Sequence, residues 1–438
     1  MAKLVISIGL FLLIGLSIFL FGCTNAGIPN DQPIQDTISP SDQQPVTPLV
    51  DEVTVTSKDT NSIVEANNKF AFDLYSKYQT EDGNIFISPY SVSTALAMTY
   101  EGAKGQTAKE MQTVLYLPEN AELRRDAISQ IYKGINKEDK TYQLSTANAL
   151  WAQDSFKFQK DYFDIVQKYY GGSATNLDFI GDTENSRLII NEWVEERTND
   201  KIKDLIPSGA LTAETRLVLT NAIYFKGEWA NQFNKDDTKE QDFRVSPNKN
   251  VKTPMMQRTD DESKFNYAGT NDLQILELPY SGEDLSMLII LPKKEDLEDL
   301  ENSFTLEQLS KWKEMLNEQR VNIYIPKFKF ETKYFMEEIL PDMGMPTAFS
   351  DSANFTGMED DPRKDLKIDK VIHQAFVEVN EEGTEAAAAT AVTMIEITSV
   401  GPEPRIPTFR ADHPFIFIIQ QKDTGNILFL GRVNDPTT

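Results

Sequence analysis

The sequence predicts a single α+β domain in which helices lie mostly early in the chain and strands mostly late. Three observations predict this class. The composition, with 40% hydrophobic and 25% charged residues, is that of a soluble globular protein. Apolar residues recur at helical spacing in the early part of the domain and alternate in the later part. No internal repeat and no Pro- or Gly-rich break interrupts the chain after residue 60, which favours one large domain.

Helical segments are predicted from apolar spacing and from one proline. Ile63, Phe70 and Leu74 recur at the spacing of a single helix face. Pro89, directly after Ser88, is well placed in the first turn of a helix. The predicted helices are residues 63–78, a segment that opens at 88 and includes 98, residues 107–115 and residues 185–198.

Strands are predicted where side chains alternate or where a short run is apolar throughout. Residues 285–291 form such an apolar run, which is typical of a strand buried on both faces. Residues 321–330 alternate strictly, and Asp423 and Gly425 mark a turn between the last two strands. The predicted strands are residues 142–151, 216–225, 285–291, 321–330, 370–379, 414–420 and 427–433.

The charge and the scarce residue types exclude several classes of function. A net charge of −25 with no basic stripe repels nucleic-acid phosphates, so we expect no nucleic-acid partner. One cysteine and two histidines cannot form an intrachain disulfide and leave almost no room for a Cys/His metal cluster, so we expect neither metal nor cofactor. A hydrolase with a histidine base would need His373 or His413, both in strand contexts. We therefore do not expect an enzyme, and a hydrolase stays open only as an alternative.

The amino terminus has the features of a secretory signal. Lys3 precedes an apolar run over residues 4–21 and a small residue stands before the break. Residues 20–23 resemble a prokaryotic lipobox, which implies cleavage before Cys23 and lipid on its sulfur, although Phe21 replaces the usual small residue. An uncleaved transmembrane anchor is the alternative, for which the run is short. Both interpretations place the rest of the chain outside the cytoplasm, either secreted or anchored to the outer face of a prokaryotic cell membrane.

Residues 23–60 are predicted to be a flexible linker that starts at the lipid-bearing cysteine. Prolines recur there among Asp, Gln, Ser and Thr, and no aromatic residue lies between Phe21 and Phe70. Such a composition buries too little apolar surface to become ordered. We therefore expect a signal peptide at 1–22, this linker, and one domain at 61–438.

The segment that follows the predicted strand 370–379 contains an unusual run of small residues. Taken alone, its alanines favour a helix. As a strand, the segment has one face of small or apolar side chains, while the charge of Glu385 falls on the other face. Gly383 supplies backbone freedom where such a segment would swing, and Pro402 would end any insertion because proline cannot donate to a central ladder. The small or apolar face carries Thr384, Ala386, Ala388, Thr390, Val392 and Met394.

Five motifs together resemble the serpin family. The motif EEGTEAAAAT at 381–390 is similar to the hinge of inhibitory serpins. The motif NIFISPYS at 84–91 resembles the start of the helix beneath the central sheet, and NAIYFKGEW at 221–229 resembles a central strand of that sheet. The motifs FRADHPF at 409–415 and FLGRV at 429–433 resemble the closing strands. They occur in serpin order over nearly the whole domain.

The resemblance implies a fold of about three β-sheets surrounded by eight or nine helices, with an exposed reactive-centre loop at residues 381–408. It implies that a protease cuts this loop, forms an acyl-enzyme and is trapped when the loop inserts into the central sheet. It also implies roles for specific residues. The hinge would be Glu381, Gly383, Thr384, Ala386, Ala388 and Thr390. The polar cluster called the shutter would be Ser88, Ser91, Asn221 and His373, and the breach, where the loop enters the sheet, would contain Trp229.

The position of the cut bond depends on how the loop is counted. Counting from the hinge, as in typical inhibitory serpins, favours the bond between Ile397 and Thr398. Counting back from the closing strand points nearer to residues 400–401, and bonds within 394–397 also stay open. No Lys or Arg lies in residues 381–404, which disfavours a trypsin-like target with a carboxylate in its pocket. An elastase- or subtilisin-like protease fits better, with a Glu-specific enzyme as an outlier.

The resemblance also implies how the protein meets its partner. An inhibitory serpin acts as a monomer that forms a covalent 1:1 complex with a serine protease or, in some cases, a cysteine protease. A non-inhibitory serpin acting as a carrier or chaperone-like protein is the alternative. Such members usually carry charged or bulky hinge residues, whereas this hinge carries small ones.

Overall fold

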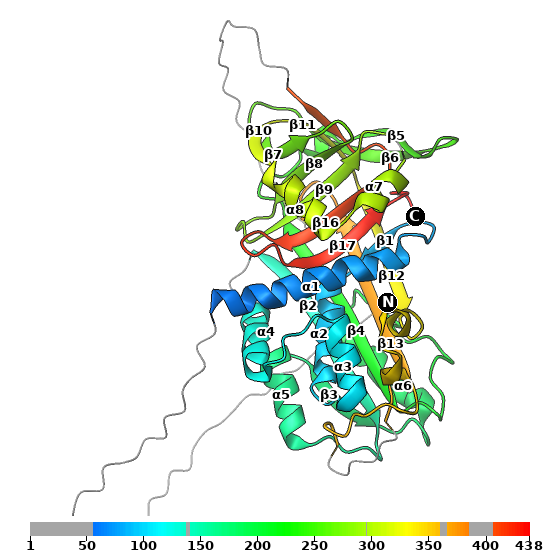
Figure 1. Ribbon diagram of the computed structural model, residues 1–438. Helices are drawn as coiled ribbons and strands as arrows, with labels where there is room; N and C mark the ends of the chain where they lie inside the picture. Colours follow the sequence, from blue (N-terminus) through cyan, green and yellow to red (C-terminus); the bar gives the residue numbers. More distant parts are fainter. Residues whose placement is uncertain (1–55, 137–140, 295, 360–365, 385–405) are drawn as a thin grey trace, which may run out of the picture. The chain divides into compact units, whose positions relative to one another are not determined.

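Three β-sheets and nine α-helices are present in the residues that the computed structural model describes, namely 56–136, 141–294, 296–359, 366–384 and 406–438 (Figure 1). The predicted α+β class, with about three sheets and eight or nine helices, is confirmed. The helices are α1 (Ser57–Tyr78), α2 (Pro89–Tyr100), α3 (Gly105–Val114), α4 (Ala121–Ile135), α5 (Lys160–Tyr170), α6 (Thr183–Arg197), α7 (Glu298–Ser303), α8 (Leu306–Glu314) and α9 (Ile339–Met343). All four predicted helices are found, as α1, α2, α3 and α6.

Helix α1 begins at Ser57, inside the segment predicted as linker. A reciprocal capping box explains this start: the Thr56 side chain accepts from the backbone N–H of Asp59, and the Asp59 carboxylate accepts from that of Thr56. The first residues of the helix lack apolar periodicity, so the apolar spacing that predicts a helix begins only at Ile63. Among the described residues, no helix has both the length and the apolarity that crossing a bilayer requires.

Two further sheets flank the one that contains the site. The seven-stranded sheet has the order β1-β17-β16-β9-β8-β7-β10, and the four-stranded sheet has the order β15-β11-β6-β5. The first contains β1 (Ile85–Ile87), β7 (Lys264–Gly269), β8 (Leu273–Pro279), β9 (Leu285–Pro292), β10 (Asn317–Arg320), β16 (Phe415–Gln421) and β17 (Ile427–Val433). The second contains β5 (Lys239–Ser246), β6 (Lys249–Arg258), β11 (Asn322–Pro326) and β15 (Thr408–Arg410).

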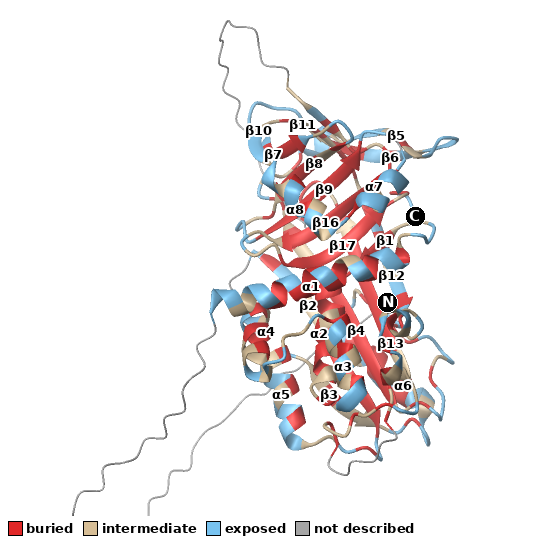
Figure 2. Ribbon diagram, in the orientation of Figure 1, coloured by how far each residue is buried: buried red, intermediate tan, exposed pale blue. Residues whose placement is uncertain are grey.

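The six-stranded sheet positions the functional residues, with the order β12-β13-β14-β4-β2-β3. Its strands are β2 (Tyr142–Gln153), β3 (Ser173–Leu177), β4 (Leu217–Glu228), β12 (Phe328–Phe335), β13 (Lys370–Val379) and β14 (Gly383–Thr384). Strands β4 and β13 and the carboxyl-terminal half of β2 are buried, whereas β3 and β12 are only partly buried and the surrounding helices keep an exposed face (Figure 2). Strand β4 has no fully exposed residue, which agrees with its apolar sequence.

Helices cover both faces of this sheet and create two separate cores. On the inner face, Leu219 and Ile223 of β4 belong to the large core that also contains residues of α2. On the outer face, Val218 and Ala222 of the same strand pack with residues of α6. Successive residues of β4 therefore face α2 and α6 alternately, as the pleat of a strand requires.

The prediction of one strand over residues 321–330 is wrong. This segment forms β11 in the four-stranded sheet and then β12 in the six-stranded sheet. Pro326, which has no backbone N–H, ends β11, and the N–H of Lys327 donates to the Pro254 carbonyl across the junction at 2.8 Å. The alternation predicts an extended chain correctly, but it does not show that the chain passes from one sheet to another. The other predicted strands are found as β2, β4, β9, β13, β16 and β17.

Candidate functional site

The chain turns back into the six-stranded sheet directly after β13. Residues 380–383 form a tight turn in which the Asn380 N–H donates to the Gly383 carbonyl at 2.9 Å. The Asn380 side-chain oxygen accepts from the N–H groups of Glu382 (3.0 Å) and Gly383 (3.2 Å), as asparagine often does in turns. Gly383 and Thr384 then form β14, which lies between β13 and β4 and runs antiparallel to both. The first residues of the predicted hinge are thus already part of the sheet.

Gly383 lies too close to β4 for any side chain. A Cβ at this position would stand 2.1 Å from the Gly227 carbonyl oxygen and 2.6 Å from the Glu228 Cα. A glycine inside a strand often marks such an approach of another backbone. In the resting molecule this close packing requires a glycine, in addition to the backbone freedom predicted for Gly383, whose φ is 158°.

Two buried glutamates before β14 are neutralised by lysines. The carboxylate of Glu381 accepts from Lys327 Nζ and from Thr238 Oγ1, both at 2.8 Å, and Glu382 pairs with Lys235. Burial opposes ionisation of Glu381, but the hydrogen bonds from Lys327 and Thr238 outweigh it and hold the pKa of this carboxyl below its ordinary value. Both glutamates are only 4% exposed, and each has a lysine as its charge partner.

Trp229 and Tyr280 hold the turn and β14 from the β4 side. The backbone N–H of Trp229 donates to the Glu382 carbonyl at 2.8 Å, and its indole N–H donates to the Asn380 carbonyl at 3.0 Å. The indole stacks on Tyr280 with ring centroids 4.6 Å apart. The Tyr280 hydroxyl lies 2.8 Å from Thr384 Oγ1, so the threonine is both buried and hydrogen-bonded. These contacts define the described part of the breach.

The four residues predicted as the shutter lie together beneath β4 and β13. The Ser88 N–H donates to His373 Nε2 at 3.0 Å. This nitrogen is therefore the acceptor, and Nδ1 carries the proton that it donates to the Asn221 side-chain oxygen. The Asn221 amide donates to Ser91 Oγ at 2.6 Å. His373 and Asn221 are also direct neighbours in the parallel pairing of β13 with β4.

The shutter extends to a third strand and to the seven-stranded sheet. Ser91 Oγ donates to the Asn148 side-chain oxygen at 3.0 Å, and Asn148 belongs to β2. Ser88 Oγ donates to the Leu428 carbonyl of β17 at 2.6 Å. The hydrogen bonds of the shutter thus connect α2 to the six-stranded sheet and to the seven-stranded sheet. Any separation of β4 from β13 at this level must break the bond between His373 and Asn221.

His373 is neutral in the folded protein over a wide pH range. It is fully buried, and this loss of hydration lowers its pKa to about 3 against the weaker opposing effect of its hydrogen bond with Asn221. A protonated ring would also place a second N–H opposite the Ser88 N–H, because both ring nitrogens would then be donors. The shutter as it stands therefore requires a neutral histidine.

Strand β14 enters the sheet between two strands that are otherwise direct neighbours. Strands β4 and β13 pair directly over residues 218–224 and 370–376, and β14 separates them beyond these residues. A sheet with this geometry accepts an antiparallel strand between two parallel ones. Within the described ranges, no group of three or more His, Cys, Asp and Glu side chains is arranged to hold a metal ion.

Comparison with known proteins identifies the family. Residues 65–436 match the family described as serpin (serine protease inhibitor). The chain belongs to the serpin family. An uncharacterized serpin-like protein of Methanosarcina acetivorans is 45% identical to this serpin over 379 residues, which cover 85% of this chain and 88% of that protein.

Solved structures of two serpins are similar to this one. The first is Serpin48, a highly specific serpin of the insect Tenebrio molitor, with a TM-score of 0.77 and 32% identity over 85% of this chain and 98% of Serpin48. The second is human thyroxine-binding globulin, with a TM-score of 0.77 and 29% identity over 87% of this chain and the whole of that one. The fold is therefore shared by serpins with different tasks.

In this serpin the predicted site residues fall into two groups. Ser88, Ser91, Asn221 and His373 meet in the shutter, while Trp229 lies in the breach with Glu381, Gly383 and Thr384. The other predicted site residues lie outside the described residues. These are Cys23, Ala386, Ala388, Thr390, Ile397 and Thr398.

Several residues that hold the hinge are not marked by any motif in the sequence. Lys327, Lys235 and Thr238 have no spacing or motif that separates them from ordinary surface residues. Asn148 does carry a signal, because it is a polar residue on the inner face of β2, where the following inner-face residues Leu150 and Ala152 are apolar. Tyr280, which reaches Thr384, follows the end of β8 and carries no such signal.

Proposed function

We propose that this serpin is a suicide-substrate inhibitor of serine proteases, with cysteine proteases as a second target class. The protease nucleophile attacks the carbonyl of the cut bond, an acyl bond forms, and the new amine leaves. The loop still attached to the hinge then inserts between β13 and β4, as a continuation of β14, before water can hydrolyse the acyl-enzyme. The product would be a covalent 1:1 complex with monomeric serpin.

The observation that carries the proposal is β14 itself. Gly383 pairs with Glu228, and Thr384 pairs with Gly227 on one side and Val379 on the other. A strand that continued in this register would run down between β13 and β4. Alternate residues from Ala386 to Met394 are small or apolar, and no proline stands between Thr384 and Pro402, as such a strand requires.

The proposed cut lies between Ile397 and Thr398, with 400–401 and the bonds within 394–397 as the other positions. All of them lie outside the described residues. The absence of Lys and Arg from residues 381–404 supports an elastase- or subtilisin-like target over a trypsin-like one.

The test is to mix the protein with elastase, subtilisin and trypsin and to run denaturing gels. We expect a band at the combined mass with elastase or subtilisin and none with trypsin. Mass spectrometry of the released peptide would identify the cut bond. Simple cleavage by all three proteases, with no complex at any ratio, would contradict the inhibitory proposal.

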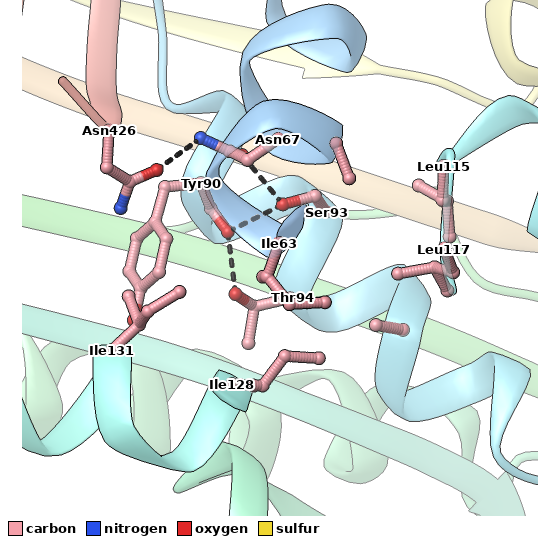
Figure 3. Close-up of a pocket in the computed structure, with 12 residues that line it drawn as sticks. Ile63, Asn67, Tyr90, Ser93, Thr94, Leu115, Leu117, Ile128, Ile131 and Asn426 are labelled. Atoms are coloured by element: carbon pink, nitrogen blue, oxygen red, sulfur yellow. Dashed lines mark hydrogen bonds between the residues drawn. The ribbon is translucent and has the colours of Figure 1, made fainter. Parts of the chain in front are cut away.

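Two cavities in the described residues bear on the carrier alternative, and both are small. A small cavity lies between α1, α2 and α4 and is lined by apolar side chains such as Ile63, Ile128 and Ile131 (Figure 3). Its volume is about 30 Å³, and that of a second, more polar cavity near Leu300 is about 210 Å³. Pockets for small-molecule ligands usually measure roughly 300–1,000 Å³.

The amino-terminal features support a further proposal on location. We propose that residues 1–22 act as a signal peptide and that Cys23 carries lipid, which would anchor the domain outside the cytoplasm through the linker. An inhibitor held there would meet proteases that approach the cell from outside.

A further inference from the structure

The point at which β14 begins to separate β4 from β13 is defined by their pairing. In their parallel pairing, Lys370 is opposite Val218 at one end and Phe376 is opposite Tyr224 at the other. Three residues further along β13, Val379 pairs with Thr384 of β14 instead of with β4. Tyr224 and Phe376 are therefore the last residues that pair across the two strands before β14 separates them.

The rings of Tyr224 and Phe376 contact each other across this boundary. Their centroids lie 6.4 Å apart at an interplanar angle of 43°, within the range of favourable aromatic pairs. Both residues lie on the outer face, since their strands alternate and the shutter residues occupy the inner face. They are 2% and 9% exposed, although they border the point at which the sheet divides.

Two lysines cover this aromatic pair. Lys201, from the segment that follows α6, places its ammonium 5.8 Å from the centroid of the Tyr224 ring. Lys329 of β12 places its ammonium 5.4 Å from the centroid of the Phe376 ring and also pairs with Glu378 at 2.9 Å. A cation over an aromatic face is attractive, and the lysine stems shield the rings from water.

Insertion of a strand would end the contact between the rings. Neighbouring strands lie about 4.8 Å apart, so a new strand between β4 and β13 moves them to roughly twice that distance. Aromatic pairs are favourable only up to about 7 Å between centroids. The present 6.4 Å contact therefore exists only while the two strands are direct neighbours.

We propose that Tyr224 and Phe376 form a positioning pair that sets the resting depth of the hinge at Thr384 and must separate before more of the loop enters the sheet. The inference rests on the proposed inhibitory function and assigns control of its insertion step to two residues. The shutter bond between His373 and Asn221 lies three residues further down the same two strands, so it would open after the aromatic pair.

The first test measures amide hydrogen exchange on the uncleaved full chain, which needs no protease. In Phe376→Val, we expect exchange of the β4 and β13 amides at residues 221–224 and 373–376 to rise about two- to ten-fold, the range that the loss of one aromatic pair predicts. Phe330→Val is the matched control. Phe330 is 8% exposed on the neighbouring strand β12, and its ring contacts Phe86 and Phe328 without reaching β4.

An equal rise in both variants, or no rise in Phe376→Val, would overturn the proposal. If Phe376→Val does not fold, Tyr224→Leu removes the same contact from the other strand. We expect it to give the same local increase.

The second test separates a positioning role from general packing. The loop is cut with subtilisin, and the melting temperatures of the cut and uncut forms are compared for each variant. If the cut loop inserts, the pair is already separated in the cut form, so Phe376→Val should lower the melting temperature of the uncut form more than that of the cut form. Phe330→Val should lower both, and an equal loss in both forms of Phe376→Val would count against a positioning role.

The experiments distinguish failure of the proposed inhibitory function from failure of the proposal on the aromatic pair. If cutting the loop raises no melting temperature and no protease complex forms, the inhibitory function fails. The exchange measurement still decides whether the aromatic pair limits the opening of the sheet.

Discussion

Thr384 is the residue at which the proposed mechanism is most sensitive to one side chain. It is 1% exposed and its hydroxyl meets the Tyr280 hydroxyl. In Thr384→Arg, a guanidinium would have to enter this site without a charge partner, at a penalty of several kcal/mol. We expect the variant to be cut as a substrate and to form no complex with elastase or subtilisin on a denaturing gel. Thr384→Ser, which keeps the hydroxyl, should still form one, and an unchanged yield from Thr384→Arg would contradict the insertion model.

His373 predicts a loss of stability on acidification. In the unfolded chain a histidine takes up a proton near pH 6.5, whereas in the fold its pKa is lowered to about 3. Below pH 6.5 the unfolded state therefore binds more protons than the native state, and the free energy of unfolding falls by about 1.4 kcal/mol per pH unit down to about pH 3.

The measurement is the midpoint of urea denaturation at pH 7.5, 5.5 and 4.5. We expect the midpoint of the wild type to fall across this series, and that of His373→Gln to fall less steeply from a lower starting value. Replacement of the other histidine in His413→Gln is the control. Identical slopes in wild type and His373→Gln would show that a different group is responsible.

At the scale of elements, the turn between β13 and β14 is held by charges from outside the sheet. Lys327 stands at the junction of β11 and β12, and Lys235 lies in the short 3-10 helix Lys235–Asp237 after β4. Each pairs with a buried hinge glutamate. The resting position of the hinge therefore depends on segments that no hinge motif includes.

Lys327→Gln should loosen the hinge. It leaves the buried Glu381 carboxylate with only Thr238 as a side-chain donor. Because Lys327 is partly exposed, we expect a loss of about 1 kcal/mol, seen as roughly five-fold faster exchange of the Gly383 and Thr384 amides. Lys311→Gln, which removes an exposed pair with Glu307 on α8, should leave these amides unchanged. Equal exchange in both variants would show that the Lys327 pair does not hold the hinge.

Residues 321–330 show what alternation along a strand can and cannot predict. Their strict alternation predicts one strand, yet the chain crosses from β11 to β12 and from one sheet to another. Alternation reports only that successive side chains face opposite ways. Which sheet receives each part depends on pairing with Met255 and Met256 of β6 in one case and with β13 in the other.

For the whole molecule, the proposed anchor makes a prediction about Cys23. In a prokaryotic host the wild type should incorporate labelled fatty acid and have a mature amino terminus at Cys23. Cys23→Ala, which lacks the sulfur that receives the lipid, should incorporate none. An unlabelled wild type with an intact amino terminus would instead support the uncleaved transmembrane anchor.

The sequence by itself determined the α+β class, all four predicted helices, most predicted strands and the family. Local spacing, caps and motifs are sufficient for these features, because each depends on residues near one another in the chain. It also placed the shutter and breach residues in their groups, through the resemblance of their motifs to serpins.

Only the tertiary structure decided how far the hinge enters the sheet at rest. That depth depends on Glu228 facing Gly383, on Lys327 facing Glu381, and on Tyr224 facing Phe376. The members of each pair are brought together by the pairing and packing of strands from distant parts of the chain. No periodicity in the sequence encodes such contacts, because their energies depend on distances that exist only after the sheets have assembled.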